Sequence, residues 1–191
     1  MKAHENPFNV QRIEKIRYNP LDTTIPQLLD KLEQLNYRAA IAGPEGSGKT
    51  TLLEDLKKYL KQKNINTINF FINDTNPCTS ANINKLIESL NGDEIVLLDG
   101  ADLISPLKWL IFKKKILKHA AGLIITTHKP SKLPVLIECR TTVALFKNIV
   151  KQLIGGEHSL DCADLEQIYD SHNGNIRSAL AQLYDIWAEM A

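Results

Sequence analysis

The sequence predicts an α/β fold with a doubly wound, mostly parallel five-stranded sheet and a small C-terminal helical lid. Three observations carry this prediction. Short apolar runs alternate with amphipathic stretches over residues 37–156, as strands and helices do around a parallel sheet. A glycine-rich loop at residues 43–48 joins the first apolar run to a helical pattern. Residues 157–191 contain two helical patterns and no strand pattern. We therefore expect an N-terminal arm and helix (1–36), a core (37–156) and a lid (157–191).

The N-terminal arm is expected to be irregular over residues 1–20, and a helix then begins. Thr24 is a candidate N-cap, Pro26 suits a first helical turn, and the leucines that follow share one face. In many nucleotide-binding folds the segment before the first core strand lies against the base, so Tyr18 or Ile16 could contact one. The alternative is that the arm only packs against the core.

Residues 43–50 fit the phosphate-loop pattern, in which Gly and four free positions precede Gly-Lys-Ser/Thr. A buried strand at 37–42 and a helix at 51–60 are expected on either side, which is the context that the motif requires. The glycines allow a tight turn with N–H groups pointing inward, and the positive end of the helix favours an anion. Lys49 would bind the β and γ phosphates, and Thr50 would offer its hydroxyl to Mg²⁺.

The residues expected to contact the nucleotide are Gly43, Pro44, Glu45, Gly46, Ser47, Gly48, Lys49, Thr50 and Thr51. The alternative, a chance glycine-rich turn, is disfavoured because the strand and the helix are both present.

The third apolar run indicates where a metal ion would sit. A second strand is expected at 64–73, and a helix capped by Thr79 follows it. The run at 94–99 is typical of a central parallel strand and ends in Asp99. A carboxylate at that end of the strand is placed to bind Mg²⁺ together with Thr50. The alternative role for Asp99 is a helix cap or turn.

The next helix is expected to begin at Ser105-Pro106. Its lysines at 113–115 and 118 favour a solvated face, with a nucleic-acid patch as the alternative. The side chains expected to face inward are Leu107, Leu110, Ile111 and Leu117.

Two further strands complete the expected sheet. The run at 122–128 should end beside the Asp99 strand, near the γ-phosphate, and a fifth strand is expected at about 135–143. A helix through Leu153 follows. The lid is expected to contain helices at 161–171 and 176–188, with an Asn-Gly-Asn break between them.

Composition limits the classes of protein that fit. A net charge of +1 does not point to a nucleic-acid or membrane partner, and no apolar run is long enough to span a bilayer. The N-terminus lacks the apolar segment of a secretion signal, and three scattered cysteines lack metal-ligand spacing. We therefore expect a cytoplasmic protein with buried or idle thiols.

The order of these motifs resembles the additional-strand division of P-loop ATPases, which includes the AAA+ proteins and the STAND and NACHT ATPases. The run 96–102 is similar to the NACHT form of the metal-site strand, with an acidic residue, Asp102, beyond the aspartate. Gly100 stands where most AAA+ enzymes place a catalytic glutamate. The resemblance makes Asp102 the general-base candidate and implies slow hydrolysis.

Two other segments carry the same resemblance. The strand 124–130 looks like the sensor-one strand of the STAND group, with Thr127 and His128 at its end, and His128 replaces an arginine. The segment 172–180 is similar to the AAA+ lid, which assigns Arg177 the sensor-two role. A surface arginine without this role is the alternative.

The resemblance implies a Mg²⁺-dependent ATPase that acts as a nucleotide-driven switch on an unidentified protein partner. Two alternatives stay open. An assembly scaffold with little hydrolysis, with assembly on DNA as one form of it, is favoured by Gly100. A small-molecule or nucleotide kinase is disfavoured because the five arginines do not cluster after Asp99. The sequence leaves open whether the chain forms a homo-oligomer.

Overall fold

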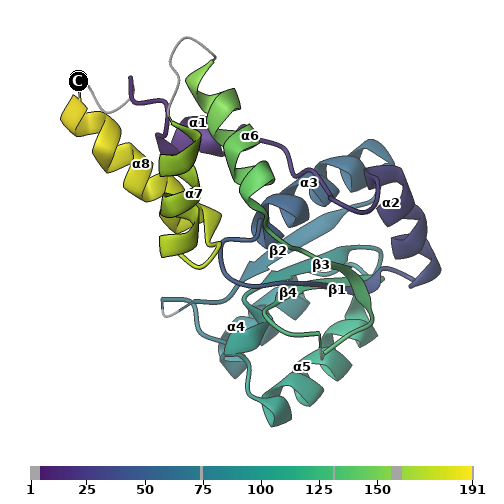
Figure 1. Cartoon of the computed structure of the whole chain (residues 1–191). Coiled ribbons are helices and arrows are strands. Elements are labelled where there is room, and N and C mark those ends of the chain that lie inside the picture. The colour runs from purple at the N-terminus through teal and green to yellow at the C-terminus, as the bar shows by residue number, and fades with distance from the viewer. Residues whose placement is uncertain (1–4, 74, 131, 156–160, 191) are drawn as a thin grey trace. The chain divides into compact units, whose positions relative to one another are not determined.

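The computed structural model describes residues 5–73, 75–130, 132–155 and 161–190. The chain divides into two compact units (Figure 1). The core unit comprises residues 19–43 and 49–139, and the helical unit comprises residues 1–18, 44–48 and 140–191. The three-part division expected from the sequence stays a prediction, and its boundary at residue 156 lies outside the described residues.

The core unit contains a sheet of five strands, in the order β2-β3-β4-β1-β5. All four strand pairs are parallel, so the α/β fold with a doubly wound sheet is confirmed. β4 lies between β1 and β3, which brings the carboxyl ends of these three strands to one edge. The strands are β1 (Arg38–Ala42), β2 (Thr67–Phe71), β3 (Ile95–Asp99), β4 (Gly122–Thr127) and β5 (Val135–Glu138).

Helices cover both faces of this sheet. Figure 1 shows α2 and α3 on one face and α4 and α5 on the other. The expected caps are present, because Thr24 and Gln27 form a capping box at α2 and the Thr79 hydroxyl accepts from Asn82 N at α4. The elements are α2 (Ile25–Gln34), α3 (Lys49–Gln62), α4 (Ser80–Glu88), the 3₁₀ turn η1 (Ala101–Leu103) and α5 (Pro106–His119).

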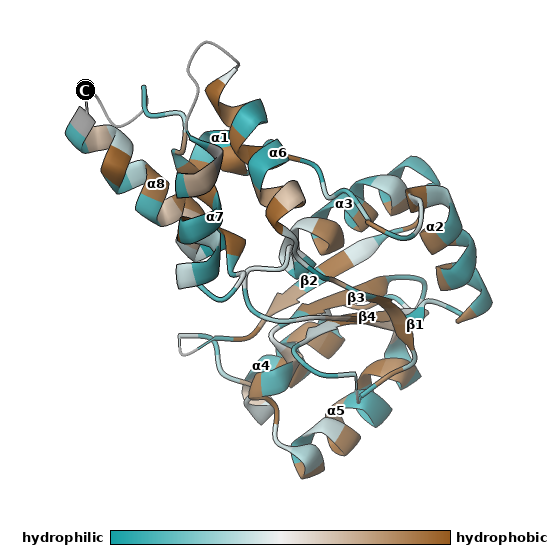
Figure 2. Cartoon of the chain, in the orientation of Figure 1, coloured by the Kyte–Doolittle hydropathy of each residue, from teal (hydrophilic) through white to brown (hydrophobic). Residues whose placement is uncertain are grey.

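The central strands β1, β3 and β4 are buried along almost their whole length. Figure 2 shows the hydrophobic colouring that follows the sheet, in contrast to the hydrophilic outer face of α2. The continuous apolar runs of the sequence therefore mark strands covered by helices on two sides. Among the described residues, no helix combines the length and the apolar character needed to cross a bilayer.

The orientation expected for α5 is wrong. Leu107, Leu110 and Ile111 are 71%, 59% and 51% exposed, whereas Trp109, Phe112 and Ile116 are buried. The Phe112 ring stacks on Phe70 of β2 and on Trp109, with centroids 6.0 and 5.9 Å apart. α5 carries two apolar stripes, and the one with the aromatic rings has more surface to bury, so it faces the sheet. Leu117 is partly buried against the core, as expected.

The helical unit contains its own hydrophobic core. Phe8 and Phe146 are buried there, and Phe8 makes an edge contact with Trp187. Its helices are α1 (Val10–Ile13), α6 (Val143–Ile154), α7 (Cys162–Ser171) and α8 (Ile176–Met190). Both lid helices were expected, and Gly155 follows α6 as its C-cap with φ 75°, as expected for the glycine that closes this helix.

Two expectations in this region need correction. Residues 1–20 are not wholly irregular, because Asn9 caps α1 and Asn6 donates from Nδ2 to the Tyr184 carbonyl, 2.9 Å away. The fifth strand ends at Glu138 rather than near residue 143, since the Thr142 hydroxyl accepts from Leu145 N and begins α6.

Candidate nucleotide-binding site

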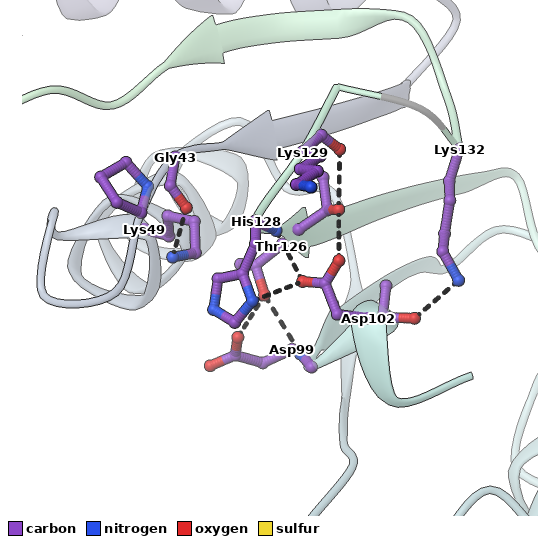
Figure 3. Close-up of polar contacts among 12 residues, drawn as sticks. Gly43, Lys49, Asp99, Asp102, Thr126, His128, Lys129 and Lys132 are labelled. Atoms are coloured by element: carbon purple, nitrogen blue, oxygen red, sulfur yellow. Dashed lines mark hydrogen bonds and ion pairs between the residues drawn. The ribbon is translucent and has the colours of Figure 1, made fainter. Parts of the chain in front are cut away.

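The loop lysine and threonine lie in the first turn of α3, at the carboxyl edge of the sheet. Lys49 Nζ donates to the Gly43 carbonyl at 2.8 Å (Figure 3). Gly43 N in turn donates to the Thr127 carbonyl at 3.1 Å, so the end of β1 is joined to the end of β4. The Lys49 side chain therefore folds back onto the start of its own loop.

A hydroxyl and a carboxylate come together as the sequence predicts. Thr50 Oγ1 donates to Asp99 Oδ2 at 2.9 Å. Both are hard oxygen donors of the kind that Mg²⁺ prefers, and this ion ordinarily completes its shell with waters and phosphate oxygens. This donor pair therefore fits a magnesium ion that is bound together with a nucleotide.

Sequence reasoning missed Thr126, which holds the Asp99 carboxylate. Thr126 is 2% exposed, its hydroxyl donates to Asp99 Oδ1, and it accepts from Gly100 N at 3.1 Å (Figure 3). β3 and β4 pair with Leu98 opposite Ile125, so the next position of β4 lies opposite the aspartate. The sequence does show a threonine one residue before the end of β4. Its role could be predicted only once the pairing of β4 with β3 was known.

Asp102 is tied to the end of β4. Its Oδ1 accepts from Thr127 Oγ1 at 2.8 Å, and its Oδ2 accepts from His128 N at 2.6 Å. His128 Nδ1 lies 3.5 Å from the same Oδ2 (Figure 3). The three residues that the resemblance singled out around the sensor strand therefore form one cluster, in which both carboxylate oxygens have protein donors.

Lys132 holds the turn that carries Asp102. Its Nζ donates to the carbonyls of Ala101 and Ile104, both at 2.8 Å, and lies 5.1 Å from the centre of the Trp109 ring. Burial lowers the pKa of Lys132, and the negative charge of Asp102 opposes that shift. This lysine therefore fixes η1 through its carbonyls.

The loop residues 44–48 belong to the helical unit. Gly46 has φ +71°, and a Cβ there would collide with Asn175 Oδ1, so a larger residue does not fit. Asn175 Oδ1 also accepts from Ser178 N at 3.1 Å, in the first turn of α8. A Cβ at Gly48 would lie 3.1 Å from the Tyr18 ring. The start of α8 and Tyr18 therefore both touch the phosphate loop.

The remaining predicted site residues are placed as follows. Arg177 is exposed in the first turn of α8, two residues after Asn175, and Thr51 is exposed on α3. Pro44 and Glu45 are exposed, whereas Ser47 is buried and donates to the Pro44 carbonyl at 2.7 Å. Tyr18 lies against the loop, and Ile16 packs on the core of the helical unit.

No family model and no curated protein matches the chain, but several solved structures do. RuvB of Thermotoga maritima, a Holliday junction branch migration motor, matches with a TM-score of 0.59 at 18% identity, covering 87% of this chain and 63% of that chain. DnaA of Aquifex aeolicus bound to AMPPCP gives 0.61 at 16% identity, covering 91% and 63%.

A third match is the replication initiator DnaA bound to AMPPCP and single-stranded DNA, with a TM-score of 0.60 at 16% identity. At such identities these matches show the fold alone: the chain has the fold of RuvB and DnaA, as the resemblance to the AAA+ P-loop ATPases led us to expect. The chain spans somewhat less than two thirds of the length of these neighbours.

Proposed function

We propose that this chain binds ATP with Mg²⁺ at residues 43–51 and acts as a nucleotide-driven switch on a protein partner, with ATP hydrolysis as the step that resets it. The observation that carries the proposal is the 2.9 Å contact between Thr50 and Asp99 beside the loop lysine. The neighbours solved with AMPPCP lend support, because their fold is the same.

Each residue at the carboxyl edge would have a distinct task. The loop N–H groups and Lys49 would bind the phosphates, and Thr50 and Asp99 would hold the magnesium ion, which neutralises phosphate charge when bound. Thr126 orients the Asp99 carboxylate. Asp102, with Thr127 and His128, would respond to the γ-phosphate, and Asp102 would take the proton of the attacking water.

The switch would involve the lid. Asn175 touches the phosphate loop at Gly46, and Arg177 follows it in the same helical turn. We assign Arg177 to the γ-phosphate, so that a bound triphosphate would hold the start of α8 and its release would free it.

Calorimetry with ATP and Mg²⁺ tests the proposal. Lys49→Ala should abolish the binding heat, and Asp102→Asn should leave binding intact while slowing turnover. Exposed Lys61 on the same helix serves as the control, because Lys61→Ala should bind ATP as the wild type does. Binding of ATP by the Lys49→Ala protein at wild-type affinity would refute the site.

A second candidate function is an ATP-dependent scaffold with little hydrolysis, with DNA association as one form of it. It is favoured by one observation: both oxygens of the Asp102 carboxylate already accept protein hydrogen bonds. ATP turnover measured against protein concentration separates the two. Specific activity that rises with concentration supports a switch completed by a neighbouring subunit. Negligible turnover with ATP-dependent growth in particle mass supports the scaffold.

A further inference from the structure

An apolar surface on the core unit is left uncovered. It consists of Leu103, the last residue of η1, and Leu107, Leu110 and Ile111 of α5, whose exposed fractions run from 51% to 71%. We call this set the α5 face. Single exposed leucines are ordinary on protein surfaces, but four large aliphatic side chains gathered on two consecutive elements are a feature of interaction sites.

The α5 face continues into positive charge. At about 100° per residue, the three apolar residues of α5 fall within one sector, and Lys114 and Lys118 fall in the same sector on the following turns. Both lysines are exposed, and α5 contains five lysines and no acidic residue. A partner that covers this face must therefore supply apolar side chains at one end and negative charge at the other.

The opposite side of α5 argues against two kinds of occupant. Trp109 and Phe112, the aromatic residues of the helix, are buried against the sheet. Amphipathic helices that bind membranes place such rings at the lipid interface, and proteins that bind single-stranded nucleic acid use them to stack bases. The exposed sector instead has an aliphatic centre with lysines beyond it. That pattern matches helix-on-helix packing with a charged end.

We infer that the α5 face docks an amphipathic helix of a partner protein, which presents aliphatic residues to Leu107, Leu110 and Ile111 and acidic residues to Lys114 and Lys118. The surface reaches the nucleotide site through the chain itself, because Leu103 directly follows Asp102. Docking does not rest on ATP binding, and it can be measured without nucleotide.

Selection from a displayed library of helical peptides tests this inference. The library holds peptides of about 16 residues, close to the length of α5. It is selected on the full chain and counter-selected on a Leu110→Ser/Lys114→Glu variant. Enriched peptides should carry aliphatic residues at helical spacing, followed by Asp or Glu one to two turns further on.

Affinity measurements on the best enriched peptide then test both parts of the surface. Leu110→Ser and Lys114→Glu should each weaken its binding about ten-fold, and added salt should weaken binding to wild type but not to Lys114→Glu. The control Lys61→Glu makes the same change of charge at an exposed position of α3 and should alter affinity less than about two-fold. Circular dichroism and thermal melting show that each variant is folded.

Several outcomes would overturn the inference. One is a library that yields no enrichment, or enriched peptides without acidic residues. Another is wild-type binding to vesicles of phosphatidylcholine and phosphatidylglycerol, or to duplex DNA, that Leu110→Ser abolishes while no peptide binds. A third is a dimer in sedimentation that Leu110→Ser dissociates, again with no peptide enriched, which would make a second copy of this chain the occupant.

Discussion

Gly100 occupies the position directly after Asp99, with φ +89° and a carbonyl neighbour that leaves no room for a side chain. A Cβ there would lie 2.6 Å from the Ile72 carbonyl oxygen, which is closer than such atoms approach. The backbone therefore requires a glycine at the position where the resemblance to AAA+ enzymes places a catalytic glutamate. A glutamate at this position would have to adopt the same left-handed backbone, and its Cβ would clash with the Ile72 carbonyl.

Gly100→Ala should destabilise the fold by about 2–4 kcal/mol, from the left-handed conformation together with the clash. Gly92→Ala is the matched control, because Gly92 has φ +106° with nothing within 4 Å of a Cβ. That variant should lose only about 1 kcal/mol. Urea denaturation gives both values. Equal losses would show that the Ile72 carbonyl does not restrict this position.

Thr126 offers a second test at the scale of a single side chain. Thr126→Val keeps the shape but removes the donor to Asp99 and the acceptor for Gly100 N. We expect a stability loss of about 1–2 kcal/mol and about ten-fold weaker ATP binding in Mg²⁺, with little change in EDTA. Thr67→Val, on the edge strand β2, is the control. Unchanged Mg²⁺ dependence would remove Thr126 from the site.

At the scale of the element, Glu94 fixes the turn between α4 and β3. Its carboxylate accepts from Asn91 N at 2.8 Å, from Asn91 Nδ2 at 2.9 Å and from Gly92 N at 3.1 Å. The hydrogen bond from Asn91 N is the main cause that lowers the pKa of Glu94 below its usual value of 4.5. The turn is therefore built around the ionised form of this carboxylate.

A lowered pKa in the folded state sets the direction of the pH effect. The Glu94 contribution to stability is complete above the usual pKa and is lost as the pH falls through the lower folded value. Glu94→Gln should remove that part of the acid sensitivity, so its melting temperature should fall less than that of wild type below about pH 4.5. Exposed Glu88 provides the control, since the melting temperature of Glu88→Gln should change with pH as that of wild type does. If the melting temperatures of Glu94→Gln and wild type fell equally with pH, Glu94 would not be the source of this acid sensitivity.

At the scale of the whole molecule, a bound nucleotide should stabilise the folded chain. ATP at a hundred times its dissociation constant contributes about 2.7 kcal/mol, which for this length raises the melting temperature by about 5–10 °C. Asp99→Asn should lose the Mg²⁺-dependent part of that shift and keep the part seen in EDTA. Asp22→Asn, which changes an exposed carboxylate, should behave as wild type. A full Mg²⁺-dependent shift in Asp99→Asn would place the metal elsewhere.

The buried face of α5 could not be predicted from the sequence. Its two apolar stripes have the same helical spacing, so periodicity alone could not tell which would be buried. Phe8 was missed for a related reason, because its apolar partners in the helical unit come from the far end of the chain. By contrast, the caps at Thr24, Thr79 and Asp161 were predictable, since each is a contact between residues at most three apart.

Local sequence patterns were enough to predict the parallel α/β core, the loop that places Lys49 at the start of α3, and Asp99 at the end of a buried strand. These features depend on backbone periodicity and on turn chemistry, which act over a few residues. Three other features follow from long-range packing: Thr126 holds Asp99, Asp102 binds the end of β4, and the leucines of α5 face outward. Those outcomes depend on which strands become neighbours and on which stripe buries more surface, and both are settled by contacts between residues far apart in the chain.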